Sequence, residues 1–178
     1  MEKCGCQEQC YPDECINSKL SIFCSTKNCS LGGVCGNSFE READGLTLFR
    51  SRVGIVVYTR KPIDPGVIIA EYCGQLRAYD GMYKSNVDPA KLKHNTGYSM
   101  LLHTRPTRTG YFAFVEAVKY GGIARFINHS DSPNTAFREL RNRRSVKVGV
   151  VSTRTINPGD ELTVDYGDEI WFACAPTE

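Results

Sequence analysis

The sequence predicts a mostly β domain of small sheets, preceded by a short cysteine-rich module that binds two zinc ions. Seven of the nine cysteines fall within the first 35 residues. After them the apolar runs are short, rich in branched residues and separated by turn residues such as Pro-Gly, which is typical of strands. Helical patterns are scarce, because the polar segment 77–97 offers only two short candidates, at 81–85 and 89–94.

Composition sets broad limits on the protein class. A chain of 178 residues is long enough for one domain with a sizeable core. Its apolar content of 41% and charged content of 24% are ordinary for a globular protein, and a net charge of +2 says little about partners. We expect no membrane span, because no run of eighteen apolar residues occurs. The first residues also lack the apolar segment of a secretory signal.

The first 39 residues contain too little apolar surface to offset the entropy cost of ordering the chain. Metal is one way to hold such a segment. Tetrahedral zinc takes four ligands, so seven thiolates can hold two ions only if one sulfur bridges them. A disulfide-stapled knot is the alternative, but an odd, crowded set of cysteines without a secretory signal favours metal. The main apolar residues of the segment are Leu20, Ile22, Phe23, Leu31 and Val34.

The rest of the chain contains a series of expected strands and one expected helical turn, at 123–127. Between the strands, Pro followed by Gly at 65–66 and 158–159 provides turns. The expected strands are 46–49, 55–59, 67–72, 98–103, 111–115, 146–152 and 161–164.

Two motifs, RFINHS at 125–130 and ELTVDY at 161–166, stand out in this region. Read singly, each is weak: a histidine among small polar residues is usually a structural hydrogen-bonder, and a tyrosine after a strand often only caps it. Together with EYCG at 71–74 and the cysteine cluster before them, they occur in an order that resembles the SET-domain protein lysine methyltransferases, including the AWS (associated-with-SET) zinc module.

This resemblance implies a SET-domain fold of small β-sheets around a knot-like substructure, in which the strand bearing Asn128 and His129 is threaded beside the segment ending in Tyr166. It also implies a domain organisation. The AWS-like module spans 1–39, and the SET domain spans 40–170 with a variable insertion at 77–97. The segment 171–178 is short and lacks a cysteine-rich post-SET element.

The resemblance further implies S-adenosylmethionine and two structural zinc ions as cofactors. One zinc would be bound by Cys4, Cys6, Cys10 and Cys15, and the other by Cys10, Cys24, Cys29 and Cys35, with Cys10 bridging. Tyr166 would stand at the point of methyl transfer, and Tyr72 and Tyr120 are candidates for the wall of the lysine channel. The implied S-adenosylmethionine contacts are Val53, Gly54, Tyr98, Arg125, Asn128, His129, Tyr166 and Trp171.

The chain departs from the family pattern in places that bear on this site. The usual Gly-x-Gly before the strand at 55–59 reads Arg52-Val53-Gly54. Asp131 stands where relatives often carry a cysteine that helps bind a third zinc. Only Cys174 lies near the end of the sequence, so a third zinc is not expected.

An AWS module before a SET domain resembles enzymes that methylate lysine 36 of histone H3 in nucleosomes. The predicted function is therefore a histone lysine N-methyltransferase acting on chromatin in the nucleus. The alternatives are methylation of a non-histone protein, or a catalytically silent SET module that binds chromatin. A basic turn at 138–147 is either a solvated hairpin or a contact to nucleosomal DNA phosphates. It contains Arg138, Arg141, Arg143, Arg144 and Lys147.

Overall fold

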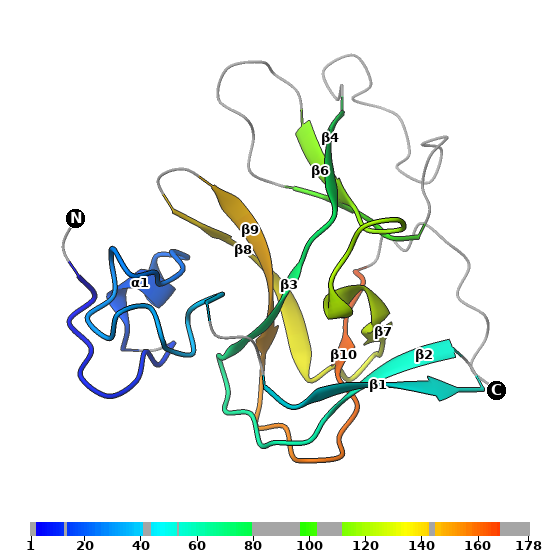
Figure 1. Cartoon of the computed structure of the whole chain (residues 1–178), viewed down its shortest axis with the longest axis horizontal. Helices are drawn as coiled ribbons and strands as arrows, with labels where there is room; N and C mark the ends of the chain where they lie inside the picture. Colours follow the sequence, from blue (N-terminus) through cyan, green and yellow to red (C-terminus); the bar gives the residue numbers. More distant parts are fainter. Residues whose placement is uncertain are drawn as a thin grey trace.

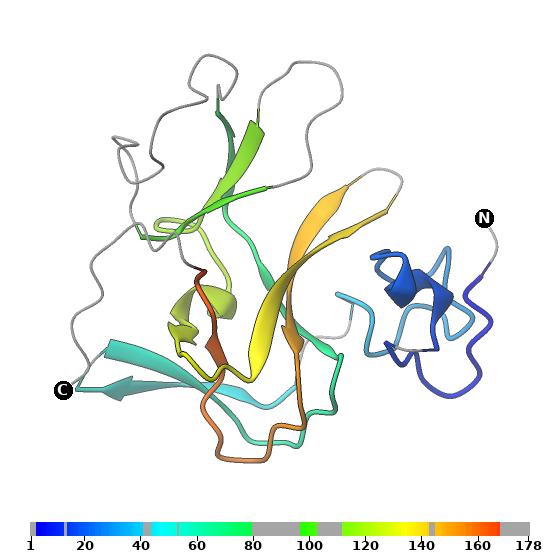
Figure 2. The ribbon, with the colours of Figure 1, turned by 180° about the vertical axis from the view of Figure 1, so that it is seen from behind.

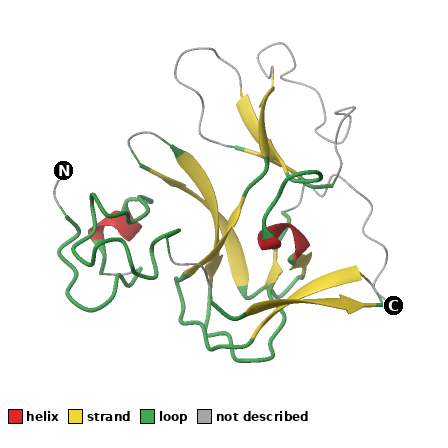
Figure 3. Cartoon of the chain, viewed as in Figure 1, coloured by secondary structure: helices red, strands yellow, loops and turns green. Residues whose placement is uncertain are grey.

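The computed structural model describes residues 3–12, 14–40, 44–52, 54–79, 97–102, 112–142 and 145–167. Within them it contains ten strands, one short α-helix and one 3-10 helix, which confirms the mostly β fold (Figure 1, Figure 3). The expected helical turn is present as the 3-10 helix η2, Ile123–Phe126. The two helix candidates at 81–85 and 89–94 lie outside the described residues. No helix of the described part is long and apolar enough to cross a membrane.

Two of the three sheets are small and antiparallel. Strands β1 (Leu46–Ser51) and β2 (Gly54–Thr59) form a hairpin. Strands β4 (Gln75–Tyr79), β6 (Phe112–Glu116) and β5 (Ser99–Leu101) form a sheet in that order. Strand β4 was not expected, and it includes residues 77–79, which the sequence placed in the insertion. It pairs with β6 through five registered residues.

The third sheet is the centre of the fold and has the order β3-β9-β8-β10-β7. Strand β10 lies between β7 and β8, which are neighbours in sequence, and it runs parallel to both. A late segment is therefore inserted between two earlier ones, as the knot-like substructure requires. The strands of this sheet are β3 (Ile68–Tyr72), β7 (Asn128–His129), β8 (Thr135–Arg141), β9 (Val146–Ser152) and β10 (Thr163–Val164).

The basic segment 138–147 forms a hairpin, which was one of the two expected readings, but its basic residues do not all lie in one turn. Arg138 and Arg141 lie on β8 and Lys147 lies on β9, and the two strands pair antiparallel over seven residues. The run of arginines obscured this strand, but all seven of its residues pair with β9, and Leu140 within it is buried. Arg143 and Arg144 lie outside the described residues.

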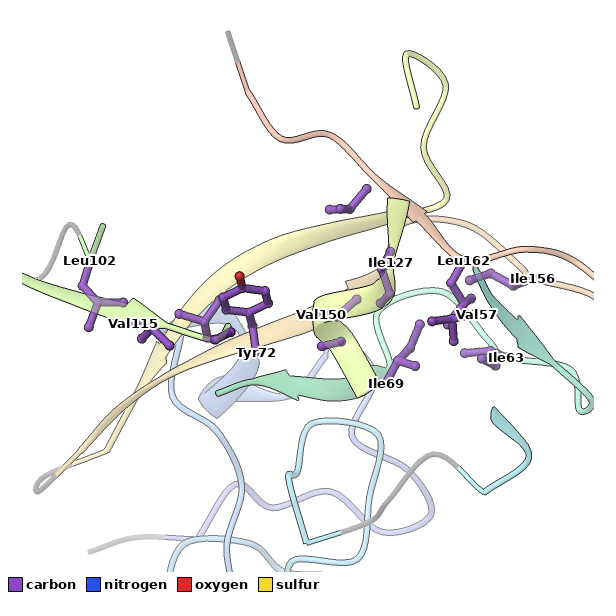
Figure 4. Packing of buried hydrophobic residues seen from close by; sticks show 14 residues of the cluster. Val57, Ile63, Ile69, Tyr72, Leu102, Val115, Ile127, Val150, Ile156 and Leu162 are labelled. Atoms are coloured by element: carbon purple, nitrogen blue, oxygen red, sulfur yellow. The ribbon is translucent and has the colours of Figure 1, made fainter. Parts of the chain in front are cut away.

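Side chains alternate across the central sheet and build two separate cores. On one face, Ile69, Val148 and Val150 join the main cluster with Tyr72 (Figure 4). On the other face, Ile68, Leu140 and Val151 pack against Phe23 and Phe39 of the N-terminal segment. The central sheet is therefore covered on both sides, once by its own domain and once by the cysteine-rich module.

The cysteine-rich module has one short helix, α1 (Ile16–Lys19), and is otherwise loop (Figure 3). It is joined to β8 by a parallel bridge between Ile22 and Arg141, in which Phe23 N–H donates to the Arg141 carbonyl at 3.2 Å. Ile68 N–H of β3 donates to the Gly36 carbonyl at 2.7 Å. Both views show the module beside β8 and β9, on the side away from β7 and β10 (Figure 1, Figure 2).

Candidate functional site

The site is organised by the parallel pairing of β7 with β10, which places Asn128 opposite Thr163 and His129 opposite Val164. These strands are only two residues long, so side chains complete their bonding. The Asn134 amide donates to the Glu161 carbonyl at 2.8 Å, and its oxygen accepts Thr163 N–H at 2.9 Å. The buried Asn134 side chain therefore makes the hydrogen bonds to the backbone around β10 that a longer neighbouring strand would make.

His129 is held between Tyr166 and Asp131. The backbone N–H of Tyr166 donates to His129 Nδ1 at 3.2 Å, so Nδ1 must be the unprotonated nitrogen. In the neutral ring the proton is therefore on Nε2, which lies 3.2 Å from Asp131 Oδ1. Asp131, the residue that departs from the family pattern, acts here as the hydrogen-bond acceptor for the histidine.

The Tyr166 side chain folds back onto the same motif. Its hydroxyl donates to the Ile127 carbonyl at 2.8 Å, and its ring centre lies 5.4 Å from that of His129. Backbone and side chain of Tyr166 are thus both fixed by residues 127–129. The two sequence motifs form one site, although about thirty-five residues separate them.

Asn128 connects this knot to the beginning of β2. Its amide donates to the Ile55 carbonyl at 3.3 Å and to Glu161 Oε1 at 3.2 Å. Gly54, next to Ile55, has φ +132°, a backbone conformation that residues with a side chain rarely adopt. The structure therefore brings two residues expected to bind the cofactor, Gly54 and Asn128, to one place. Val53 and Trp171 lie outside the described residues.

Arg125 lies on η2, three residues before Asn128 in the sequence. Its Nη1 donates to the carbonyls of Ala117 and Val118 at 2.9 and 2.8 Å, and its guanidinium lies 4.6 Å from the Phe126 ring centre. Its Nε is buried and has no hydrogen-bond partner within the described part of the chain. A buried N–H without a partner carries a desolvation cost of about 1–3 kcal/mol, more for a charged group. Such a donor fits a site that receives a polar ligand.

The tyrosines expected to line the lysine channel differ in burial. Tyr72 is 8% exposed, packs edge-on against Phe137 and donates its hydroxyl to the Tyr98 carbonyl at 2.8 Å. Burial, and secondly the nearby Tyr166, raise the pKa of Tyr72, so its hydroxyl stays protonated at neutral pH. Tyr120 is 68% exposed, and Tyr98 is 38% exposed. Tyr72 is thus buried, whereas Tyr120 lies at the surface.

Several residues that position the site were not singled out from the sequence. Glu161 lies within the second motif and Asn134 lies four residues after the first, but neither was given a role. Ala117 accepts from Arg125 and donates its N–H to the Tyr98 carbonyl at 3.1 Å, so it links two of the expected cofactor contacts. A small apolar residue at 117 gives no sequence signal for such a role, because only its backbone takes part.

The cysteine sulfurs of the module converge in two overlapping sets. Cys10, Cys24, Cys29 and Cys35 form the set expected for one ion. The second set contains Cys4, Cys10, Cys15 and Cys24, whereas Cys24 was expected to bind one ion only. In each set all ligand atoms lie within 4.8 Å of one another. Cys6, expected as a ligand, is outside both sets of the described residues, and its sulfur lies 4.0 Å from the Cys4 carbonyl oxygen.

The chemistry of these sulfurs fits a cation. Cys10 Sγ lies 3.8 Å from the sulfurs of both Cys4 and Cys29, well beyond a disulfide bond of about 2 Å. Burial, followed by neighbouring cysteines, raises the pKa of Cys10. For Cys24, the hydrogen bond with Cys35 and then burial raise the pKa. Buried thiols held this close become thiolates together only if a positive ion compensates them. Either set offers the four sulfurs that tetrahedral zinc takes.

The outermost cysteines have opposite tendencies. Burial raises the pKa of Cys4, but backbone N–H groups of Ser30 and Cys6 outweigh it and lower the pKa to about 6. Burial, and then the Cys4 side chain, raise the pKa of Cys6 to about 12. A lowered pKa favours the thiolate of Cys4 at neutral pH, and the pKa of Cys35 is also lowered, first by its hydrogen bond with Cys24.

Comparison with known proteins agrees with this geometry. The family model described as SET domain matches residues 54–167. The histone-lysine N-methyltransferase, H3 lysine-36 specific, of Kluyveromyces lactis is 30% identical over 177 residues, covering 96% of this chain and 24% of that protein. Its namesake in Debaryomyces hansenii is 28% identical over 156 residues, covering 86% of this chain and 20% of that protein. The histone-lysine N-methyltransferase SETD2 of Homo sapiens is 27% identical over 157 residues, covering 86% of this chain and 6% of that protein.

The chain thus spans no more than 24% of the length of these relatives. The family model, in contrast, covers most of the chain and includes both motifs of the site. This chain belongs to the SET-domain family.

Proposed function

We propose that the protein is an S-adenosylmethionine-dependent histone lysine N-methyltransferase that acts on chromatin in the nucleus, with lysine 36 of histone H3 as its target. The observation that carries the proposal is the β7–β10 pairing, which fixes Tyr166 against His129 beside Asn128. The target rests on the names of the relatives, two of which are specific for lysine 36 of histone H3.

S-adenosylmethionine supplies an activated methyl group when it is bound. The residues available to hold it fit a polar ligand: Asn128 and His129 on β7, the backbone at Gly54, and the buried Nε of Arg125, which has no partner among the described residues. Because Asn128 is bonded to Ile55 and His129 to Tyr166, these side chains are oriented in advance. Pre-orientation reduces the entropy cost of alignment, which is the main catalytic contribution we expect here.

Tyr166 would orient the lysine amine. Its hydroxyl hydrogen is donated to the Ile127 carbonyl, so the oxygen retains the capacity to accept an N–H from the substrate. The amine must be neutral to attack, and a nearby positive charge favours its neutral form. Tyr72, held protonated by burial and bonded to Tyr98, would supply a rigid, uncharged wall.

We further propose that the cysteine-rich module, residues 1–39, binds two structural zinc ions through Cys4, Cys6, Cys10, Cys15, Cys24, Cys29 and Cys35. Cys10 belongs to both sulfur sets, which supports it as a bridging ligand. Cys24 also belongs to both, so it is the candidate for a second shared position. Cys6 would need to move its sulfur to enter the first set.

DNA contact is proposed for the exposed arginines of β8 only. Arg138 and Arg141 are exposed, whereas Lys147 is paired with Glu71 and lies 4.8 Å from the Phe39 ring centre. Contacts to phosphates would weaken nucleosome binding steeply as salt rises. Replacing both arginines by glutamine should reduce the slope of log affinity against log salt by roughly two.

The deciding experiment is methyl transfer from labelled S-adenosylmethionine to four substrates in parallel. These are nucleosomes, nucleosomes whose histone H3 carries arginine instead of lysine 36, free histones and an array of lysine peptides from other proteins. Label on the first and not on the second supports the proposal. Label on the peptides alone indicates a non-histone substrate. No label, together with no heat of cofactor binding in calorimetry, indicates a silent module and overturns the proposal.

A further inference from the structure

The metal module must compensate a large negative charge. Seven thiolates around two divalent ions would leave roughly three excess negative charges in a poorly solvated place. Cys10, Cys15, Cys24, Cys29 and Cys35 are all buried. Hydrogen-bond donors that point at sulfur spread this charge. We therefore asked which side chains donate a hydrogen bond to a cysteine of the cluster.

Two buried asparagines donate to the same sulfur. Asn17 Nδ2 lies 3.4 Å from Cys24 Sγ, and Asn37 Nδ2 lies 3.4 Å from the same atom. Their side chains are 7% and 3% exposed. We propose that Asn17 and Asn37 are positioning residues for the metal cluster, which hold the Cys24 thiolate between the two sulfur sets and reduce its charge density.

The second N–H of each asparagine amide donates to a backbone carbonyl, which fixes the orientation of the amide toward Cys24. Asn17 Nδ2 also donates to the Asn28 carbonyl at 2.9 Å, and Asn37 Nδ2 to the Ile22 carbonyl at 2.9 Å. An amide nitrogen carries two hydrogens, and each nitrogen here has one sulfur and one carbonyl partner. The backbone supports the arrangement, because Cys24 N–H donates to the Asn37 carbonyl at 2.6 Å.

The two hydrogen bonds reach a sulfur that both metal ions would share. Cys24 and Cys10 are the cysteines that occur in both sets, so the charge on Cys24 affects both ions. Cys24 Sγ also lies 3.9 Å from Cys10 Sγ, the other sulfur that belongs to both sets. Two N–H donors at Cys24 therefore offset negative charge at the centre of the cluster.

The same loop joins the cluster to the SET domain. Ile22, whose carbonyl is held by Asn37, forms the bridge to Arg141 of β8, and Phe23 packs in the core shared with Leu140. A correctly placed Cys24 thus also presents Phe23 to β8. The two asparagines connect metal binding to the docking of the module.

Asn28 provides a matched control. It is 2% exposed, lies in the same loop and anchors it through Ser25 and the Phe23 carbonyl. Within the described part of the chain, the hydrogen bonds of the Asn28 side chain join it to nitrogen and oxygen atoms and not to sulfur. Replacing Asn28 should loosen the loop as much as replacing Asn17, without removing a donor from Cys24.

The test uses the whole chain loaded with Co²⁺, whose absorption bands report on the thiolate ligands directly. Asn17→Ala and Asn37→Ala should each move the sulfur-to-cobalt charge-transfer band to longer wavelength, because a thiolate that loses a donor gives up its electrons more easily. They should also weaken Zn²⁺ binding, measured against a chromophoric chelator, by roughly 10–100-fold. Asn28→Ala should lower the Tm and leave the band where it is in the wild type.

An unchanged band in both variants, or an equal shift in Asn28→Ala, would overturn the proposal, because a purely structural role lowers stability without altering the ligand field. If an alanine variant does not fold, Asn17→Leu and Asn37→Leu carry the same test, since leucine has nearly the same shape as asparagine, no charge and no N–H. The inference rests on metal binding by the cysteines and not on methyl transfer. Failure of the wild type to bind Co²⁺ overturns it, while loss of methyl transfer alone leaves it intact.

Discussion

The cysteine-rich module and the SET domain are stabilised by different means. Among the described residues, the buried side chains of the module are mainly sulfurs and asparagine amides, arranged in loops around one short helix. The SET domain instead buries a cluster of fourteen hydrophobic or aromatic residues between paired strands. The SET domain thus has a hydrophobic core of its own, whereas we expect the fold of the module to depend on bound metal ions.

The two regions share one small core. Phe23 and Phe39 pack edge to face, with ring centres 5.2 Å apart, and contact Ile68, Leu140 and Val151 on the central sheet. Gly149 on β9 leaves room for Phe39, because a Cβ there would lie 3.3 Å from its Cζ. Loss of bound metal should therefore displace Phe23 and Phe39 and expose one face of the central sheet, while the main core on the other face stays buried.

Metal removal should produce the largest difference in stability between the module and the SET domain. A zinc chelator should unfold the module, which loses binding free energy on the order of 10 kcal/mol, while the SET domain keeps most of its strand content. Near-ultraviolet circular dichroism follows the tyrosines and far-ultraviolet circular dichroism follows the strand content. Metal analysis of the same samples confirms that the ions have been removed. Cys10→Ser should reproduce the effect and Cys73→Ser should not, since Cys73 is exposed and outside both sulfur sets. Retention of the module signal after complete metal loss would contradict the comparison.

Removing the shared aromatic core should have the next largest effect. Phe23→Ala should lower the free energy of unfolding by about 3–5 kcal/mol, because Phe23 is 6% exposed between the two regions. Phe49→Ala is the control, since Phe49 is 59% exposed on β1 and should change stability by less than about 0.5 kcal/mol. Urea unfolding of both variants measures the difference. Equal values would mean that the module does not stabilise the sheet.

Tyr166→Phe should separate activity from stability. Loss of the hydroxyl should reduce kcat by roughly 100-fold, as expected for a group that orients the reacting amine, while S-adenosylmethionine still binds. Single-turnover methyl transfer and calorimetry check the two parts. Tyr11→Phe, at a half-exposed position of the module, should leave kcat unchanged. Full activity of Tyr166→Phe would remove the role proposed for this hydroxyl.

The ion pair between Asp44 and Lys61, which lies where the two regions meet in sequence, should have the smallest effect. The Lys61 hydrogen bond and charge lower the pKa of the Asp44 carboxyl. A lowered pKa in the folded state contributes stability above the unfolded pKa of about 3.9, and this is lost as pH falls through the folded value. Because the carboxyl is fully exposed, Asp44→Asn should not measurably change the Tm at pH 7. Carboxyl titration by NMR checks the direction, and an Asp44 pKa above 3.9 would contradict it.

Most residues of the candidate site could be predicted from the sequence, because their side-chain types and their order in the motifs are visible without a structure. Asn128, His129 and Tyr166 were found from their motifs, and the structure brings them together. The strands at 146–152 and the turn at 123–127 were found because their patterns are local. Strand β8 was missed because its arginines resemble a solvated turn, and its strand character depends on pairing with β9.

The sequence by itself predicted that the cysteines gather in one module and that the two motifs belong to one site, because cysteine density and motif order do not depend on contacts. Only the tertiary structure decided that β10 lies between β7 and β8, that Cys24 belongs to both sulfur sets, and that Asn17 and Asn37 meet at its sulfur. The physical reason is that these are pairings between distant residues. A two-residue strand or a single amide has no periodicity, so only the folded chain determines its partner.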